Sequence, residues 1–137
     1  MTSGLDRFVE AQDPVYGQVL TELNAGRKRS HWMWFVFPQL AGLGRSATAQ
    51  FYAIADLAEA KAYLAHDLLG PRLQECTQAM LEWAGKKDAE AILGPVDAMK
   101  FRSSITLFEA AGGGEEFGEA LQSFHAGERD PATLERL

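Results

Sequence analysis

The chain has 137 residues, a formal net charge of −6 and 47% hydrophobic residues, values that suit one globular domain and exclude a disordered chain. Its longest wholly apolar run, residues 32–37, is too short to cross a bilayer, so we expect no membrane partner. The acidic balance argues against a duplex nucleic acid partner, while a single cysteine and a start without a signal sequence favour a cytoplasmic protein.

The first half of the chain has one clear helix signal and one ambiguous segment. Asp13-Pro14 places a capping side chain before a proline, apolar residues at helical spacing follow from Tyr16 to Leu23, and Gly26 ends the run. Two stretches within residues 31–55, HWMWFVF and QFYAIA, are apolar on every face, so their periodicity does not separate a buried strand from a buried helix. Because helix signals flank this segment, we expect helical turns there, with a small strand pairing as the alternative.

The second half consists of helix signals separated by glycine and proline. Asp56 and Glu59 have the spacing of a capping box, and Gly70-Pro71 marks the break before an amphipathic stripe that runs from Leu73 to Ala84. Further helical segments are expected at residues 88–93, at roughly 97–111, after the glycine run 112–114 and after Asp130-Pro131. The sequence therefore predicts an all-α fold: a single compact domain over residues 1–137, with six or seven short helices and minor strand content, if any, around residues 31–55.

The most unusual feature is a window in which basic and aromatic residues coincide. No acidic residue occurs between Glu22 and Asp56, whereas Arg27, Lys28 and Arg45 lie inside this gap among tryptophans and phenylalanines. Arginine and lysine could bind a phosphate or carboxylate while Trp32 or Trp34 stacks on a ring. The alternative is that the aromatic side chains are core and the basic ones a solvated helix end.

Two other segments could contribute to the same site. GLGRSA, residues 42–47, matches a dinucleotide-binding glycine pattern, but the strand and the βαβ framework that this pattern needs are missing. A glycine loop that holds an anion with Arg45 and Ser46 remains, beside an ordinary loop with a helix cap. On the helix over residues 97–108, four polar residues could face the window: Lys100, Arg102, Ser103 and Ser104. Their alternative is an amphipathic helix whose serines bond to its own backbone.

Conventional catalytic and metal motifs are missing from the sequence. The three histidines are scattered, so we expect no metal site and no cofactor. His31 is the best general-base candidate, because neighbouring cations would favour its neutral form. Cys76 lies on the inner face of a helix and reads as packing.

Several segments together resemble one known family. They are LDRFVEAQDPVY, GRKRSHWMWFVFPQLAGLGRSATAQFYAI, AYLAH with LGPRL, and RSSITLF. The chain resembles the domain of unknown function 1810 family, small and mostly bacterial proteins described as mainly α-helical. The resemblance implies a helical fold but no activity or catalytic residues, and Phe101 stands where the family pattern has leucine. Members are sometimes labelled calpastatin, a label that a compact, repeat-free, aromatic chain does not support.

Our leading expectation is a cytoplasmic protein that binds an anionic small molecule such as a nucleotide, an ADP-ribose-like compound or another phosphorylated compound. The expected ligand-binding residues are Arg27, Lys28, Trp32, Trp34, Gln39, Arg45, Tyr52, Lys100, Arg102, Ser103 and Ser104. His31 and Ser46 are the catalytic candidates, and the residues leave open whether a reaction occurs at all. The alternative is a protein-interaction or self-associating module, monomer or homodimer; single-stranded nucleic acid binding is disfavoured by the charge of −6.

Overall fold

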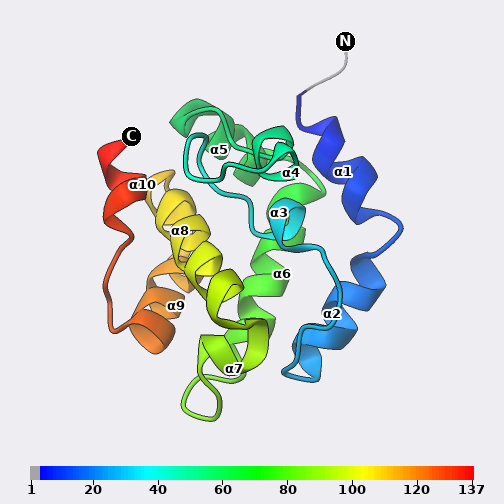
Figure 1. Cartoon of the computed structure of the whole chain (residues 1–137), viewed down its shortest axis with the longest axis vertical. Helices are drawn as coiled ribbons and strands as arrows, with labels where there is room; N and C mark the ends of the chain where they lie inside the picture. Colours follow the sequence, from blue (N-terminus) through cyan, green and yellow to red (C-terminus); the bar gives the residue numbers. More distant parts are fainter. Residues whose placement is uncertain (1–3) are drawn as a thin grey trace.

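The computed structural model describes residues 4–137, and within this range the chain forms ten α-helices and no sheet (Figure 1). The helices are α1 (Asp6–Gln12), α2 (Tyr16–Asn24), α3 (Met33–Val36), α4 (Ala47–Phe51), α5 (Leu57–Ala65), α6 (Leu69–Leu81), α7 (Ala89–Leu93), α8 (Pro95–Ala110), α9 (Glu115–His125) and α10 (Pro131–Glu135).

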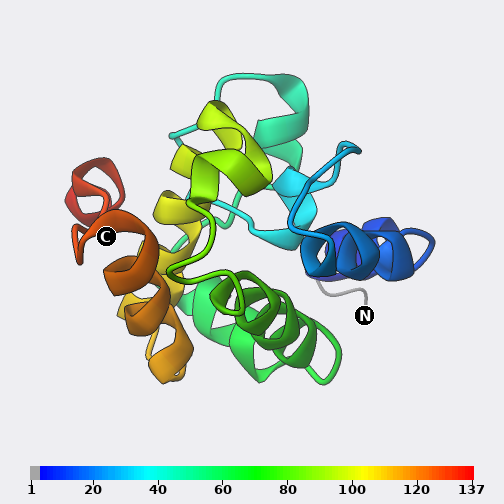
Figure 2. The same cartoon turned by 90° about the horizontal axis from the view of Figure 1, so that it is seen from below.

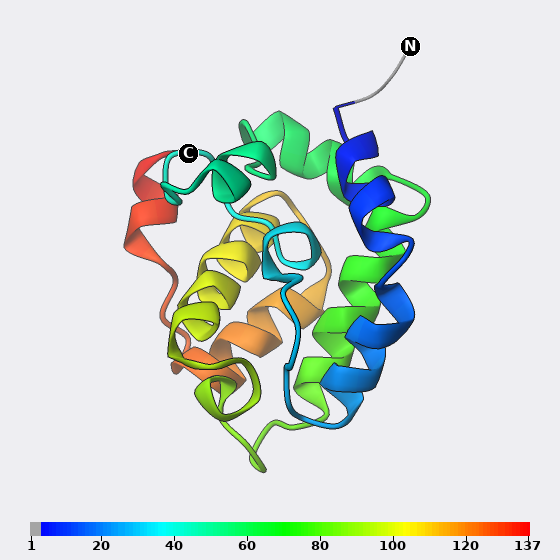
Figure 3. The same ribbon diagram turned by 45° about the vertical axis from the view of Figure 1, so that its right-hand side comes forward.

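The two longest helices, α6 and α8, organise the packing of the others. Helix α6 contacts α2, α5 and α9, while α8 contacts α5, α7, α9 and α10. The short helix α3 packs against α1, and Figures 2 and 3 show it between α8 and the α1–α2 pair, inside the ring of longer helices. The residues of α3 are therefore packed among the longer helices (Figures 2 and 3), whereas Arg27, His31 and Arg45 of the same window stay exposed.

The expected all-α class and single compact domain are confirmed, and most of the expected caps form. The side chains of Asp56, Asp88 and Asp130 each accept a hydrogen bond from a backbone N–H in the first turn of their helix. The cap expected at Asp13 is wrong, because α2 begins only at Tyr16 and the Asp13 carboxylate pairs with Arg72 instead, at 2.9 Å.

Helix α6 differs from expectation at its start. It begins at Leu69, so Gly70-Pro71 lies inside its first turn instead of before it. A proline is tolerated there because the first N–H groups of a helix have no partner within the helix. Helix α8 likewise begins at Pro95, two residues before the expected start at Asp97.

The ambiguous segment 31–55 contains the two short helices α3 and α4, as expected, joined by irregular turns. Strand pairing is limited to one isolated parallel bridge between Leu40 and Ile54, with Ala41 N–H donating to the Ile54 carbonyl at 2.8 Å. These short helices, together with α1, account for the difference between ten helices and the expected six or seven.

Large aromatic side chains fill the core between the helices. The ring of Phe37 meets that of Phe101 edge-on, with 4.9 Å between centroids, and so joins the window to α8. The largest fully buried side chains include Trp32, Tyr63, Phe8, Phe37, Phe101, Phe108 and Phe117. None of the helices in the described range is long and apolar enough to cross a membrane.

Candidate functional site

A buried carboxylate, that of Glu22 on α2, holds the basic loop in place. Glu22 is only 3% exposed, and its Oε1 accepts hydrogen bonds from the backbone N–H groups of Arg29 and Ser30 at 2.7 and 3.0 Å and from Trp32 Nε1 at 3.0 Å. Its Oε2 accepts from Ser30 Oγ at 2.6 Å and from Gln18 Nε2 at 2.7 Å. Glu22 is the last acidic residue before the acid-free segment of the sequence, and in the fold its carboxylate holds the beginning of that segment in place.

These hydrogen bonds determine the protonation of Glu22. Burial alone would raise its pKa, but donation from Ser30, Arg29, Gln18 and Trp32 outweighs burial and lowers the pKa to about 2. Glu22 is thus a carboxylate at neutral pH. Because its acceptor positions are filled by the protein, its role is to position the loop that contains the window.

A second carboxylate, that of Asp97 in the first turn of α8, lies beside the basic-aromatic window although it is far from the window in the sequence. Its Oδ2 lies 2.9 Å from Lys28 Nζ, and its Oδ1 lies 3.8 Å from Lys100 Nζ. The Lys28 ammonium is 5.1 Å from the centre of the Trp32 ring, and the Lys100 ammonium is 5.1 Å from that of Trp34. The charge of Lys28 is therefore largely compensated by Asp97, a residue far from it in the sequence.

The two tryptophans have different environments. Trp32 is fully buried and its indole N–H is used by Glu22, so it has no free face for a ligand. Trp34 is half-buried, and the ring of the exposed His31 lies 6.5 Å from its own. Of the two stacking residues proposed from the sequence, Trp34 is the one that solvent reaches.

A cleft of about 330 Å³ opens where the loop after α3 faces α8 and the start of α10. We call it the Lys100 cleft. It is lined by Gln39, Leu43, Gly44, Val96, Met99, Lys100, Ser103, Asp130 and Ala132. The fold thus brings three of the residues proposed from the sequence, Gln39, Lys100 and Ser103, to one hollow.

Asp130 is the carboxylate of this cleft, and the sequence suggested it only as a helix cap. Its Oδ2 accepts hydrogen bonds from Ser103 Oγ at 2.9 Å, from Thr133 N at 3.2 Å and from Thr133 Oγ1 at 2.6 Å. Burial raises the pKa of Asp130, but these hydrogen bonds and the charge of Arg102 lower it overall. Asp130 is therefore ionised at neutral pH, opposite Lys100 in charge.

Arg27, which precedes α3, and the basic and polar residues around α4 do not line the cleft. The side chains of Arg27 and Arg45 are exposed and make no hydrogen bond or ion pair with the described residues. Ser46 caps α4 through a hydrogen bond from the Ala49 N–H at 3.0 Å. Tyr52 packs on Phe8, Phe35 and Phe51, away from the cleft-lining set.

Two of the proposed α8 residues also have other environments. Arg102 donates from Nε to the Glu128 carbonyl and from an Nη to the Arg129 carbonyl, both at 2.9 Å, and so fixes the chain between α9 and α10. Ser104 is fully buried, and its hydroxyl has no hydrogen-bond partner among the described residues. Neither of them lines the Lys100 cleft.

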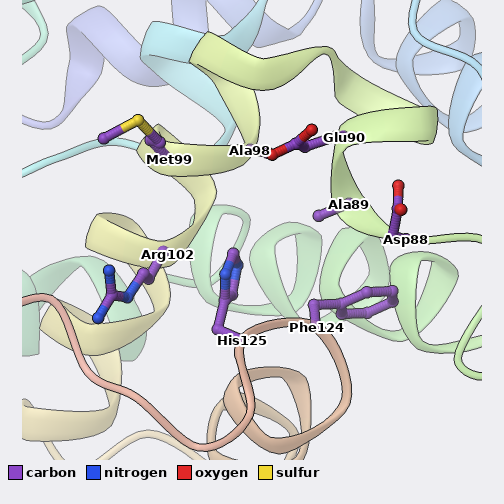
Figure 4. Close-up of a pocket in the computed structure, with 8 residues that line it drawn as sticks. All are labelled: Asp88, Ala89, Glu90, Ala98, Met99, Arg102, Phe124 and His125. Carbon is purple, nitrogen blue, oxygen red and sulfur yellow. The ribbon is translucent and has the colours of Figure 1, made fainter.

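A second hollow, of about 290 Å³, lies on the other side of Met99, and the sequence gave no signal for it beyond a scattered histidine (Figure 4). We call it the His125 pocket. It is lined by Asp88, Ala89, Glu90, Ala98, Met99, Arg102, Phe124 and His125. Burial and the nearby charge of Arg102 lower the pKa of His125, so its imidazole is neutral at pH 7. No group of three or more potential metal ligands occurs in residues 4–137.

Comparison with known proteins agrees with the fold. The chain is similar to the conserved hypothetical protein Rv1873 from Mycobacterium tuberculosis, whose crystal structure superposes with a TM-score of 0.93. The two sequences are 51% identical, and the match covers 97% of this chain and 95% of the Rv1873 chain. No curated protein matches the chain. The family model described as a protein of unknown function (DUF1810) matches residues 2–137, which confirms the resemblance seen in the sequence. The chain therefore belongs to the DUF1810 family.

Proposed function

We propose that the protein binds a small anionic, hydroxylated molecule, such as a sugar phosphate or a mononucleotide, in the Lys100 cleft. The observation that carries the proposal is that the Lys100 ammonium has no carboxylate within hydrogen-bond range. Its nearest carboxylate oxygen, Asp97 Oδ1, is 3.8 Å away, beyond hydrogen-bond range. Since Lys28 lies closer to the same carboxylate, Lys100 keeps its three N–H donors for a ligand.

The other polar groups of the cleft suit the rest of such a molecule. The Gln39 amide can both donate and accept, and the Asp130 carboxylate can accept hydrogen bonds from sugar hydroxyls through Oδ1, because the protein's own hydrogen bonds go to Oδ2. Leu43, Val96 and Met99 supply apolar surface. A volume of about 330 Å³ is at the lower end of the roughly 300–1,000 Å³ of ligand pockets, which favours one sugar or nucleotide unit.

The test is a thermal-shift titration with ribose 5-phosphate, AMP and ADP-ribose. A ligand at about a hundred times its dissociation constant stabilises the fold by about 2.7 kcal/mol, a shift of several degrees. Lys100→Gln should weaken binding about tenfold or more, because a hydrogen bond to a charged group contributes about 1.5–3 kcal/mol. Glutamine keeps part of the side-chain stem over Trp34, so the change is mainly the loss of charge.

Lys61→Gln is the matched control, because Lys61 is exposed on α5 and its side chain makes no hydrogen bond or ion pair with the described residues. Stabilisation by a phosphorylated probe that is lost in Lys100→Gln and kept in Lys61→Gln supports the proposal. Equal losses in both variants, or no stabilisation by any of the three probes, contradict it.

A self-associating module is the second candidate function, and one observation favours it. Val96 and Met99 are 66% and 71% exposed at the rim of the cleft, and such apolar side chains could also be covered by a partner. Sedimentation velocity at low and high salt distinguishes the two functions. A monomer under both conditions contradicts self-association.

A further inference from the structure

The His125 pocket is separate from the Lys100 cleft, although the two share Met99 as a wall. Figure 4 shows the His125 ring pointing from the end of α9 into the space between α7 and α8, with Glu90 on the far side. His125 Nε2 is shielded from solvent and has no hydrogen-bond partner among the described residues. A ligand in the pocket meets only atoms that solvent can also reach, so the ring nitrogen that can accept its hydrogen bond is Nδ1, which is not among the enclosed, unpartnered atoms.

The charged groups of this pocket are mostly acidic. Asp88 uses Oδ1 to cap α7, at 2.7 Å from the Ala91 N–H, which leaves Oδ2 available. The exposed Glu90 side chain makes no contact with the described residues. Arg102 is the cation of the lining, but its donors go to two backbone carbonyls and the Glu128 carboxylate lies 3.8 Å away. The Arg102 guanidinium keeps its charge, so the lining carries two carboxylates against one cation and is acidic overall.

We propose that the His125 pocket is a second binding site, which takes a primary ammonium group carried on an apolar stem. The Glu90 carboxylate and the imidazole line the pocket from opposite sides (Figure 4) and can each accept a hydrogen bond from the ammonium, and the Asp88 carboxylate adds negative charge to the lining. Ala89, Ala98, Met99 and the ring of Phe124 line the rest of the pocket and would contact the stem. A free amine and a lysine side chain present the same ammonium group on an apolar stem.

Binding depends on pH with a definite sign. Glu90 from α7 and Arg102 from α8 line the pocket with the imidazole, and Asp88 lies at the start of α7. Neutral His125 accepts a hydrogen bond, whereas protonated His125 would repel the ammonium. Affinity should thus fall from about pH 7.5 to about pH 5.5, a range that spans the ordinary histidine pKa of ~6.5, and most of the loss should come at its acidic end because the pKa of His125 is lowered.

The experiment is an NMR titration of the ¹⁵N-labelled protein with n-butylammonium and with Nα-acetyl-lysine methylamide. Shifts should concentrate on α7, on the first two turns of α8 and around His125. Equal affinity for the two probes identifies the ammonium and its stem as sufficient, whereas preference for the lysine probe identifies a protein side chain as the source. Glu90→Gln should weaken binding about fivefold, the upper end for one partly exposed ion pair.

Two variants make the result specific. Glu119→Gln removes the same charge from an exposed position on α9 that has no contacts with the described residues, and should leave the affinity unchanged. His125→Asn keeps an acceptor but cannot be charged, so the pH dependence should disappear. The proposal is overturned if neither probe shifts these residues, if Glu119→Gln weakens binding as much as Glu90→Gln, or if affinity does not fall on acidification.

Discussion

Replacing Glu22 by glutamine tests whether one buried carboxylate holds the aromatic window in place. Glutamine has nearly the same shape but no charge, and one of its two terminal groups is a donor. That NH₂ group would face groups that now donate hydrogen bonds to Glu22. On the side of Oε2 these donors are Gln18 and the Ser30 hydroxyl, and on the side of Oε1 they are Arg29 N–H, Ser30 N–H and the Trp32 indole. The variant therefore leaves buried donors without acceptors whichever way the amide turns.

The lowered pKa of Glu22 gives the magnitude. The folded protein has a pKa of about 2 at this group, against 4.5 for an unperturbed glutamate. A difference of roughly two and a half units corresponds to about 3 kcal/mol of folding stability at neutral pH. Because the folded pKa is the lower one, this stability is fully present above pH ~4.5 and falls to about 0.4 kcal/mol at pH ~2.

The assay is urea denaturation of the wild type and of Glu22→Gln at several pH values. At pH 7 the variant should be less stable by about 3 kcal/mol, or roughly 10 °C in melting temperature for a chain of this size. The gap should narrow between pH ~4.5 and ~2, and other acids such as Asp130 cancel because both proteins contain them. A gap that is small at pH 7, or one that stays constant down to the lowest pH, would refute the reasoning.

Three further predictions concern packing. Gly26→Ala should lower the free energy of unfolding in urea by at least about 1–2 kcal/mol, because Gly26 has φ +71° and a Cβ there would lie 2.8 Å from the Trp83 ring; Gly17→Ala, with nothing within 4 Å, should instead be neutral or stabilising. Arg102→Ala should speed amide hydrogen exchange in the segment between α9 and α10, since it removes two hydrogen bonds to that segment's carbonyls; unchanged exchange would contradict this role. Cys76 should not react with a thiol reagent until the protein is unfolded, because burial raises the pKa of its thiol to about 12.

The sequence was a good guide to the fold where a local signal sufficed. The caps at Asp56 and Asp130 were predicted correctly because an aspartate side chain bonds an N–H only three residues away. Asp13 was misread because its carboxylate has a tertiary partner, Arg72, that local sequence does not reveal. The segment 31–55 stayed ambiguous because it is apolar on every face and its helices are very short.

The site could be predicted only in part. The sequence proposed Gln39, Lys100 and Ser103, and the fold places all three on one cleft. It gave no reason to join Asp130 to them, because that carboxylate comes from the end of the chain. The His125 pocket was missed altogether, since its histidine belongs to a pocket that exists only when α7, α8 and α9 are packed together.

The pairing of Asp97 with Lys28 explains how an acidic protein can keep a cation without a close carboxylate partner in the Lys100 cleft. In the sequence Lys28 belongs to the basic run and Lys100 stands three residues after an acid, so Lys28 looks like the freer of the two. In the fold Asp97 lies 2.9 Å from Lys28 and 3.8 Å from Lys100, which reverses that order. Glu22 contributes to this choice because it fixes the loop that carries Lys28 against α8. The acid-free window thus matters less for its own charge than for occupying the carboxylate that would otherwise neutralise Lys100.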